Sequence, residues 1–444
     1  MGRHGKRPPQ DLGLFTDLYE LTMLQSYFDR GMDATAVFDF FVRELPPNWN
    51  FLIACGLEDL LRDLERFRFT DEAIRYLQGL KRFTPAFLNH LKKFRFTGDL
   101  RALPEGTLVF PQEPLVEVVA PLPQAQLIET LLIQRLHFQT LMASKGARVV
   151  LATRGKNLVD FGLRRMHGLE ASLEAARAFY LAGFGSTSNL KAGEELGLPV
   201  AGTMAHSYIQ AHENEEEAFE HFLETYPEAT LLIDTYDVLG AAECLVHLKK
   251  RWGKRFRLSA VRLDSGDLER DSRRVRRLLD RSGMKSVQIF ASGGLDEYEI
   301  DRLLREKAPI DGFGVGTRLG VSSDRPYLDC AYKLVEYAGT PRRKLSEKKV
   351  SLPGGKQVFR RQVRGRWAGD ELASARERRK GEPLLRSVMK GGRRLRPPPP
   401  LEELRRRVWE GIEKLPDPLR SVRSARKPYA VDLSPGLRSL IAAM

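Results

Sequence analysis

A chain of 444 residues is too long for a single compact core, so its length predicts two or more substructures. The composition, 42% hydrophobic and 29% charged, is ordinary for a globular protein, and no apolar run approaches the ~20 residues that span a bilayer. The basic N-terminus, MGRHGKRPPQ, lacks the apolar segment of a secretory signal, and residues 1–10 are expected to be disordered.

The net charge of +14 admits two interpretations. Much of the excess lies in the C-terminal quarter, where it suits either a solvated arginine-rich surface or a nucleic-acid partner. No homeodomain, zinc-finger or RNA-recognition signature accompanies it, so nucleic acid is disfavoured as a partner. A basic field also suits an anionic small substrate, because it raises the local concentration of phosphates.

The cysteines point to the compartment. Cys55, Cys244 and Cys330 are far apart and lack metal-ligand spacing, which disfavours structural zinc and a disulfide framework. We interpret them as buried thiols of a protein in a reducing cytoplasm.

The N-terminal part mixes helical and strand patterns. Thr16 or Asp17 begins a helical pattern that Gly31 ends, and residues 34–45 then alternate like a strand. Further helices are predicted for 53–67 and 71–83, short antiparallel strands for about 95–119, and a long buried helix for 125–150.

From Asn157 a repeating strand–helix rhythm begins, which predicts a parallel sheet. Seven strand candidates favour an irregular, incomplete α/β barrel over an open six-stranded sheet, and no GxGxxG motif supports a dinucleotide fold. Polar residues gather where the strands end, and these ends form the active face of a barrel. The seven runs are NLVDFGLRR, AGFGSTSN, PVAGTMAHS, TLLIDTYD, LSAVRLDSGD, VQIFASGG and DGFGVGT.

After Gly339 come short strands around Gly-Gly turns, a proline run and a terminal helix. We expect this part to pack beside the N-terminal strands. The predicted organisation is an N-terminal α+β part (11–140), a barrel catalytic domain (141–338) and a C-terminal extension (339–444). The two ends together would form a second, smaller α+β domain.

The run PVAGTMAHS carries an unusual polar end, in which Thr203 and His206 follow small apolar residues. His206 has no Cys or HExxH partner, so zinc is disfavoured, and its place at a barrel mouth favours a chemical role over a structural one. In the next run, Asp234 or Asp237 would orient His206, touch a metal-bound diphosphate or cap a helix.

Two consecutive glycine-rich turns predict a phosphate site. FASGGLDE places Gly293 and Gly294 before a helix, and GFGVGTRLG places Gly316 and Thr317 after the next strand. Glycines there let backbone N–H groups approach a phosphate, and the last two strands of a barrel are its usual place.

Charged residues at two other strand ends suit an anionic substrate. VRLDSGDL places Arg262 and Asp264 on one side of a strand, either as an internal ion pair or as an anion ligand beside a carboxylate that faces a developing cation. FGLRRMHG offers Arg164 and Arg165, which would clamp a carboxylate or pyrophosphate, or lie in solvent.

In this order, the motifs TDLYELTM, FGLRR, TSN, GTMAHS, IDTYD, VRLDSGDL, FASGGLDE and GFGVGT resemble those of nicotinate phosphoribosyltransferase, a type II phosphoribosyltransferase. The resemblance runs from about Asp11 to KPYAVDLS near the C-terminus. It implies an enzyme of NAD biosynthesis and salvage that converts nicotinate and 5-phosphoribosyl-1-diphosphate to nicotinate mononucleotide and diphosphate. It also implies a requirement for Mg²⁺, coupling to ATP hydrolysis and a cytoplasmic homodimer with shared sites.

The resemblance assigns roles residue by residue. His206 would be the transiently phosphorylated histidine, and Asp264 would stabilise the cation that develops on ribose as diphosphate leaves. The nicotinate contacts would be Tyr19, Thr203 and Arg262, with Arg164 and Arg165 near the ring and diphosphate. The contacts to phosphoribosyl diphosphate would be Gly293, Gly294, Gly316 and Thr317, and the metal ligands are left unassigned.

Three rival functions remain at this point. Nicotinamide phosphoribosyltransferases carry an aspartate where this chain has Ser188, and an acid there would repel nicotinate, so the serine favours the acid substrate. Quinolinate phosphoribosyltransferase is shorter and would lack the GTxAHS histidine. The other rival is a non-catalytic phosphate- or RNA-binding protein that uses the basic C-terminus.

Overall fold

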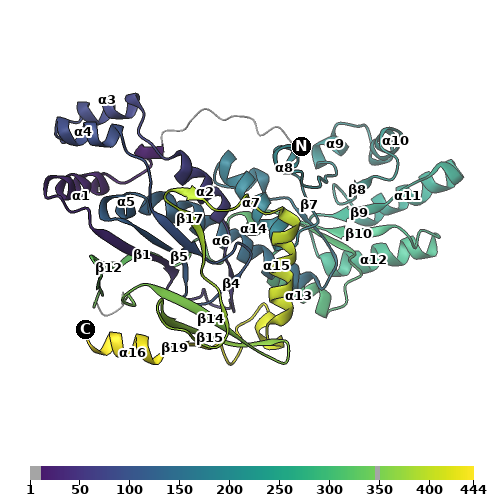
Figure 1. Cartoon of the computed structure of the whole chain (residues 1–444). Helices are drawn as coiled ribbons and strands as arrows, with labels where there is room; N and C mark the ends of the chain where they lie inside the picture. The colour runs from purple at the N-terminus through teal and green to yellow at the C-terminus, as the bar shows by residue number, and fades with distance from the viewer. Residues whose placement is uncertain (1–11, 346–350) are drawn as a thin grey trace. The chain divides into compact units, whose positions relative to one another are not determined.

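The structure is a computed structural model, which describes residues 12–345 and 351–444 (Figure 1). The predicted disordered end, residues 1–10, lies outside this range. Contacts within the chain group it into two units: the first runs to Ser144 and resumes at Tyr327, and the second is Lys145–Pro326. The sequence had placed these boundaries after residues 140 and 338. Helix α6 (Glu129–Thr153) contains the first boundary.

The second unit is built on an open half-barrel of six parallel strands, in the order β7-β6-β11-β10-β9-β8. The strands are short and mostly buried, as expected for a parallel sheet covered by helices. They are β6 (Asn157–Asp160), β7 (Ser186–Thr187), β8 (Thr230–Leu232), β9 (Ala260–Leu263), β10 (Gln288–Ala291) and β11 (Gly312–Val315).

The prediction of seven barrel strands is wrong by one within the described residues. The run PVAGTMAHS forms only an isolated bridge, in which Val200 pairs with Thr187. Two backbone bonds hold it, from Thr187 to the Pro199 carbonyl and from Ala201 to the Thr187 carbonyl. Pro199 has no N–H to extend a ladder and Gly202 weakens a strand, so the rest of the run is free to lead into the His206 segment.

Helices follow the strands, and three of them begin at an aspartate cap. The side chains of Asp237, Asp267 and Asp296 accept backbone N–H groups at the start of α11, α12 and α13, which fixes where each strand-end turn finishes. The helical segments are η2 (Leu163–Arg165), α7 (Leu169–Ala182), α8 (Leu190–Leu196), α9 (His206–Gln210), α10 (Glu215–Thr225), α11 (Val238–Trp252), η3 (Gly253–Arg255), α12 (Leu268–Arg281), α13 (Glu297–Arg305) and α14 (Thr317–Gly320).

The first unit joins both ends of the chain in one antiparallel sheet, in the order β13-β12-β1-β5-β3-β17-β18. Strand β12 pairs with β1, and β17 pairs with β3. These strands are β1 (Thr35–Val42), β3 (Asp99–Ala102), β5 (Pro114–Pro121), β12 (Cys330–Tyr337), β13 (Thr340–Pro341), β17 (Arg386–Lys390) and β18 (Arg393–Arg394). The half-barrel unit is the shorter of the two, so the expectation that the second domain is the smaller one is wrong.

Two further sheets complete the first unit, a pair β2-β4 and a four-stranded sheet β16-β14-β15-β19. Their strands are β2 (Leu52–Ile53), β4 (Leu108–Val109), β14 (Lys356–Val363), β15 (Arg366–Ser374), β16 (Glu382–Pro383) and β19 (Val431–Leu433). The helices of this unit are η1 (Leu12–Leu14), α1 (Leu18–Asp29), α2 (Leu57–Arg66), α3 (Asp71–Gly79), α4 (Pro85–Lys92), α5 (Leu122–Leu127), α15 (Leu401–Lys414), η4 (Asp417–Arg420) and α16 (Pro435–Ala442).

A buried charge cluster fixes two strand-end turns of the half-barrel. Lys145 Nζ lies 2.6 Å from Glu297 Oε2 and 2.6 Å from Asp324 Oδ1, and Arg148 Nε lies 3.0 Å from Glu297 Oε1. The Lys145 side chain is 1% exposed and that of Glu297 is fully buried. Glu297 is the first residue of α13, and Asp324 follows α14. Two cations and two carboxylates therefore hold the segments next to both glycine turns.

Replacing Lys145 is expected to destabilise the fold strongly. Lys145→Met leaves the carboxylates without their central cation, which typically costs about 3–5 kcal/mol for a buried pair. The matched control is Lys156→Met, because the side chain of Lys156 forms a long, exposed ion pair with Asp311 at 3.9 Å. This variant should lose less than about 1 kcal/mol. The measurement is the free energy of unfolding in urea. An equal loss of unfolding free energy in the two variants would show that the buried charge cluster stabilises the fold no more than an exposed ion pair does.

Candidate active site

The turns after β8, β9 and β10 are joined by hydrogen bonds among their polar side chains. Asp234 Oδ2 accepts the backbone N–H of Asp264 at 2.9 Å and the hydroxyl of Ser265 at 2.6 Å. The hydroxyl of Ser292 donates to Asp264 Oδ1. Asp264 is thereby fixed from both sides, and its second carboxylate oxygen remains available to other groups.

His206 begins helix α9 directly beside this carboxylate. Its Nδ1 lies 3.1 Å from Thr235 Oγ1, and its Nε2 lies 3.9 Å from Asp264 Oδ2. The side chain is 40% exposed, so the ring is open to a ligand. Sequence reasoning found His206 and Asp264 but missed Thr235. The one feature of the sequence that could have pointed to Thr235 is its place between Asp234 and Asp237 at a strand end.

The two candidate aspartates of IDTYD have different places. Asp237 caps helix α11 by accepting the backbone N–H of Gly240 at 2.6 Å, so the capping interpretation holds for this residue. Asp234 does not bond to His206 and instead anchors the Asp264 turn.

Arg262 is a buried cation with an unused donor. On β9, its side chain is 12% exposed, and one terminal nitrogen donates to the Met204 carbonyl at 2.8 Å, next to Thr203. The other terminal nitrogen lies 4.0 Å from Asp264 Oδ1, and the guanidinium carbon lies 5.9 Å from the Phe161 ring centroid. Burial lowers the pKa of this guanidinium below its usual range. Its Nε is buried without a hydrogen-bond partner among the described residues, so the group suits an anionic ligand.

The arginines of FGLRR lie in the short helix η2 and both are exposed. The charge of Arg164 reaches Arg262 and contributes to the lowering of its pKa, so Arg164 belongs to the same electrostatic site. For Arg165, the structure records only a backbone bond from its N–H to the Gly162 carbonyl at 2.9 Å.

The turn after β10 requires glycine. Gly293 has φ +85°, and a Cβ there would lie 1.6 Å from the carbonyl oxygen of Asp264. Gly294 has φ +63° and faces open space. Among the described residues, the backbone N–H groups of these two glycines have no acceptor. The turn therefore offers two free donors to an anion.

The turn after β11 packs against Phe161. A Cβ on Gly314 would lie 2.3 Å from the Phe161 ring, and one on Gly316 would lie 3.0 Å from the Phe161 carbonyl oxygen. Thr317 follows as the first residue of α14. Gly314 thus makes room for the Phe161 ring, over which Arg262 lies.

A cavity of about 420 Å³ opens beside the turn that follows β10. Gly293 and Gly294 line it together with Gly266 and the side chains of Arg302 and Arg318. His206, Arg262 and Asp264 are not part of its lining.

Tyr19 belongs to the first unit, near the start of α1, and its position is described only within that unit. The side chain is half-exposed at 50%. Burial and the neighbouring Glu20 raise the pKa of its hydroxyl above the usual range, so it stays protonated at neutral pH.

No group of three or more His, Cys, Asp or Glu side chains in the described parts of the chain is arranged to hold a metal ion. No disulfide joins the three cysteines in the described structure, and Cys55 is buried whereas Cys244 and Cys330 are only partly so. No helix in residues 12–345 and 351–444 is long and apolar enough to cross a bilayer.

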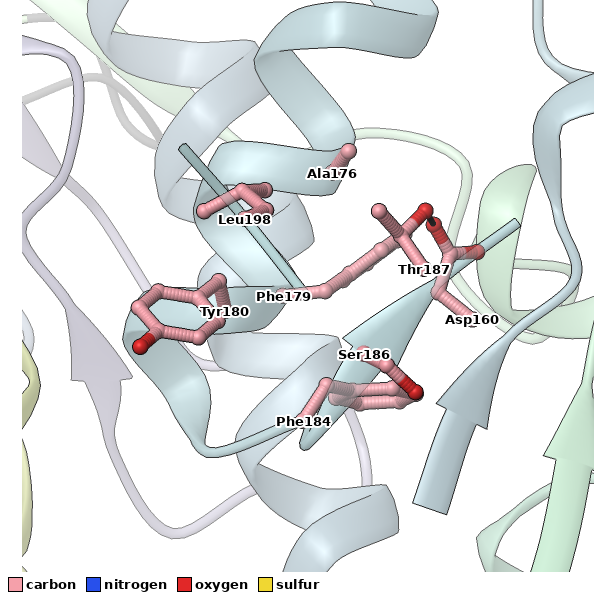
Figure 2. A pocket seen from close by; sticks show the side chains of 8 residues that line it. All are labelled: Asp160, Ala176, Phe179, Tyr180, Phe184, Ser186, Thr187 and Leu198. Carbon is pink, nitrogen blue, oxygen red and sulfur yellow. Dashed lines mark hydrogen bonds between the residues drawn. The ribbon is translucent and has the colours of Figure 1, made fainter. Parts of the chain in front are cut away.

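Asp160, the last residue of β6, links this strand to the neighbouring edge strand β7. Figure 2 shows its carboxylate and the Thr187 hydroxyl pointing toward one another, with Oγ1 donating at 2.7 Å. The other carboxylate oxygen accepts the Gly162 N–H at 2.7 Å, and the Asp160 carbonyl accepts the Ser188 N–H at 2.8 Å. Asp160 therefore holds the FGLRR turn and the TSN turn together. Burial raises the pKa of its carboxyl to about 6, although both hydrogen bonds lower it.

Glycine donors and a buried arginine at the ends of parallel strands define the class: an α/β enzyme that handles phosphate. Family models for the N-terminal domain, the main family region and the C-terminal domain of nicotinate phosphoribosyltransferase match residues 14–137, 156–356 and 367–441. The chain is 50% identical to nicotinate phosphoribosyltransferase pncB2 of Mycobacterium tuberculosis, over 95% of this chain and 91% of that one. It is 38% identical to the nicotinate phosphoribosyltransferase of Bacillus subtilis, over 79% and 73%.

The crystal structure of human nicotinic acid phosphoribosyltransferase matches with a TM-score of 0.85 and 30% identity, covering 97% of this chain and 100% of that chain. The chain belongs to the nicotinate phosphoribosyltransferase family, and the enzymatic activity predicted from the sequence is confirmed by these comparisons. The roles assigned to individual residues stay predictions.

The pKa of Asp160 predicts a pH dependence of stability. Because the folded-state pKa of about 6 lies above the ordinary 3.8, the folded protein holds this proton more tightly. The stabilisation is present below about pH 4 and is lost as the pH rises to 6, by on the order of 3 kcal/mol. Asp160→Asn should remove this slope from urea-unfolding free energies measured between pH 4 and 7.

The comparison variant for this experiment is Glu215→Gln. Burial, together with nearby Asp237 and Asp234, raises the pKa of Glu215 from 4.5 to about 7. Its substitution should flatten the pH dependence between about pH 4.5 and 7 and leave the part below pH 4.5, which belongs to Asp160. An Asp160→Asn profile parallel to that of the unchanged protein would contradict the prediction.

Proposed function

We propose that this enzyme couples the formation of nicotinate mononucleotide to ATP hydrolysis through a phosphorylated His206, as a step of NAD biosynthesis and salvage. The single observation that carries this proposal is the pairing of an open imidazole with Asp264 at the strand ends, 3.9 Å apart. The family supplies the overall reaction, and the geometry supports the individual roles.

Nicotinate would lie against Arg262. Its carboxylate needs a cation, and the buried guanidinium has an unpaired Nε to donate. Thr203 is adjacent to the carbonyl that holds Arg262, and Arg164 adds positive charge nearby. Tyr19 would stack on the pyridine ring.

Ser188 supports the acid over the amide substrate. An aspartate at this position would sit next to the Asp160 turn and repel a carboxylate. The relatives from Mycobacterium tuberculosis and Bacillus subtilis are also named for nicotinate, so nicotinamide is the weaker alternative.

Phosphoribosyl diphosphate would place its 5-phosphate on the glycine turns. The free N–H groups of Gly293 and Gly294 support this placement, with Gly316 and Thr317 on the neighbouring turn. Departure of diphosphate from C1 of ribose builds positive charge, which the fixed carboxylate of Asp264 would stabilise. The pyridine nitrogen is already a free nucleophile, so no general base is required.

The residues fit a magnesium ion that arrives with the diphosphate. Mg²⁺ is usually held by one or two carboxylates together with substrate phosphates, and Asp264 and Asp234 offer such oxygens. Asp234 Oδ1 is buried and has no hydrogen-bond partner in the described structure. Bound there, the ion would neutralise charge on the leaving diphosphate.

His206 would accept the γ-phosphoryl group of ATP. Attack requires a lone pair on one ring nitrogen, an exposed ring and room for the phosphoryl group. The 40% exposure of the side chain and the hydrogen bond to Thr235, which orients the ring, support this role.

The proposal predicts the products and one decisive variant. With Mg²⁺, phosphoribosyl diphosphate and ATP, nicotinate should yield its mononucleotide together with ADP, and nicotinamide should yield far less. His206→Ala should fold normally, form no phosphohistidine and lose all stimulation by ATP. Product and ADP are measured by chromatography, and the phosphoenzyme by labelling with γ-phosphate-labelled ATP.

The matched control is His212→Ala. His212 lies just beyond α9, where its Nδ1 bonds the Tyr208 carbonyl at 2.8 Å, and its loss should leave the ATP coupling intact. Unchanged ATP coupling in His206→Ala would refute the phosphohistidine. Equal use of nicotinamide would refute the role of Ser188.

A homodimer with shared sites is the assembly that the family suggests for this chain. Tyr19 would then act in the active site of the neighbouring subunit. Tyr19 is 50% exposed, and the apolar side chains of Phe15 and Leu18 beside it are also exposed. Such an exposed apolar patch supports contact with a second subunit.

Mixing two inactive variants tests this assembly. Tyr19→Ala and His206→Ala are each expected to lack ATP-stimulated activity, which is the activity measured here. After exchange of subunits, a mixed dimer keeps one site with both native residues, so a 1:1 mixture should regain about a quarter of the native activity. Light scattering establishes the dimer. A dimeric mixture that regains no activity would show that Tyr19 and His206 act within one subunit.

A further inference from the structure

The cavity beside Gly293 and Gly294 is lined by two arginines with very different freedom. Arg302 is the more engaged of the two: its Nε and one terminal nitrogen donate to Glu299 at 3.0 and 2.8 Å, and the other donates to Glu269 at 3.2 Å. Each of its three nitrogens is thus tied to a carboxylate of the protein, so we assign Arg302 to the cavity wall.

Arg318 has donors to spare. One terminal nitrogen donates to Asp296 Oδ2 at 2.8 Å, and no other acceptor for its side chain is found in the described structure. The side chain is 49% exposed. A guanidinium has five N–H groups, so most of them remain available to a ligand in the cavity.

Asp296 gives Arg318 a defined direction. Its Oδ1 accepts the backbone N–H groups of Tyr298 and Glu299, at 3.0 and 2.9 Å, which fixes the carboxylate at the start of α13. The side chain is only 14% exposed. Since Asp296 follows Gly294 by two residues and Arg318 follows Thr317, the ion pair also joins the two glycine turns.

We infer that Arg318 is the side-chain ligand of the 5-phosphate and that Asp296 is its positioning residue. Gly293 and Gly294 offer backbone donors to the same cavity, and an arginine fork suits a phosphate dianion. His206, Arg262 and Asp264 do not line this cavity, so it suits the phosphate that takes no part in the reaction. The inference rests on the proposed function, because it names a further contact to the same substrate.

The test is a set of three variants at the cavity. Arg318→Ala should raise KM for phosphoribosyl diphosphate by about tenfold or more, as expected for loss of a charge-assisted phosphate contact. Its kcat should change less than about threefold, and KM for nicotinate should stay the same. Arg318→Lys should be intermediate, because it keeps the charge without the fork. Asp296→Asn should raise KM less than Arg318→Ala.

Inhibitors separate the 5-phosphate from the diphosphate. Ribose 5-phosphate should compete about tenfold more weakly against Arg318→Ala, while inhibition by inorganic diphosphate should be unchanged. The control is Arg305→Gln, a surface arginine of α13 that pairs with Asp301 at 2.8 Å, and neither inhibitor should change there.

An unchanged KM in Arg318→Ala, or equal weakening of both inhibitors, would overturn the inference. Failure of the proposed function is a different result: the unchanged enzyme would then make no mononucleotide. In that case, calorimetry with ribose 5-phosphate still decides the matter, because binding that persists in Arg318→Ala excludes the contact.

Discussion

The site depends on a close approach of two backbone turns, those that follow β9 and β10. At Gly293 the chain passes so near the Asp264 carbonyl that a Cβ would lie 1.6 Å from its oxygen. This approach lets the Ser292 hydroxyl reach the Asp264 carboxylate, while the N–H groups of the glycine pair have no acceptor in the described structure. The position of the candidate catalytic carboxylate, Asp264, and the conformation of the candidate phosphate-binding turn, Gly293–Gly294, therefore depend on the same packing constraint.

Buried charge is used in two opposite ways in the half-barrel unit. Lys145 is held between Glu297 and Asp324, so its charge is balanced and its role is to fix the turns. Arg262 is buried with a donor unpaired, and burial lowers the pKa of its guanidinium. Burying a cation whose charge and donors are not fully paired lowers the stability of the fold, but it strengthens the binding of an incoming anion. This contrast separates a structural charge from a candidate ligand-binding charge more clearly than the sequence motifs do.

The strand–helix rhythm was predictable from the sequence, because short apolar runs that end in polar residues and alternate with helical patterns are typical of a parallel sheet. The same pattern overestimated the sheet at PVAGTMAHS, where Pro199 limits pairing to one bridge. Sequence motifs found His206 and Asp264 separately, but their approach depends on long-range strand order, which local patterns do not encode. Thr235 was missed because a threonine between two aspartates has no distinctive spacing. The choice between cap and ligand for Asp237 also depended on geometry.

A spacing of three residues unites the three turns. Asp234 precedes the cap Asp237, Asp264 precedes the cap Asp267, and Gly293 precedes the cap Asp296, each by three positions. In every turn the later residue caps the helix, and the earlier one lies one or two positions beyond the end of the strand. Two of these positions carry aspartates, and the carboxylate of Asp234 accepts the backbone N–H of Asp264. The third must be glycine, because any side chain there would occupy the place of the Asp264 carbonyl. The absent side chain in the third turn is thus what allows Asp264 its position, and under the proposed function it also leaves the turn open to phosphate.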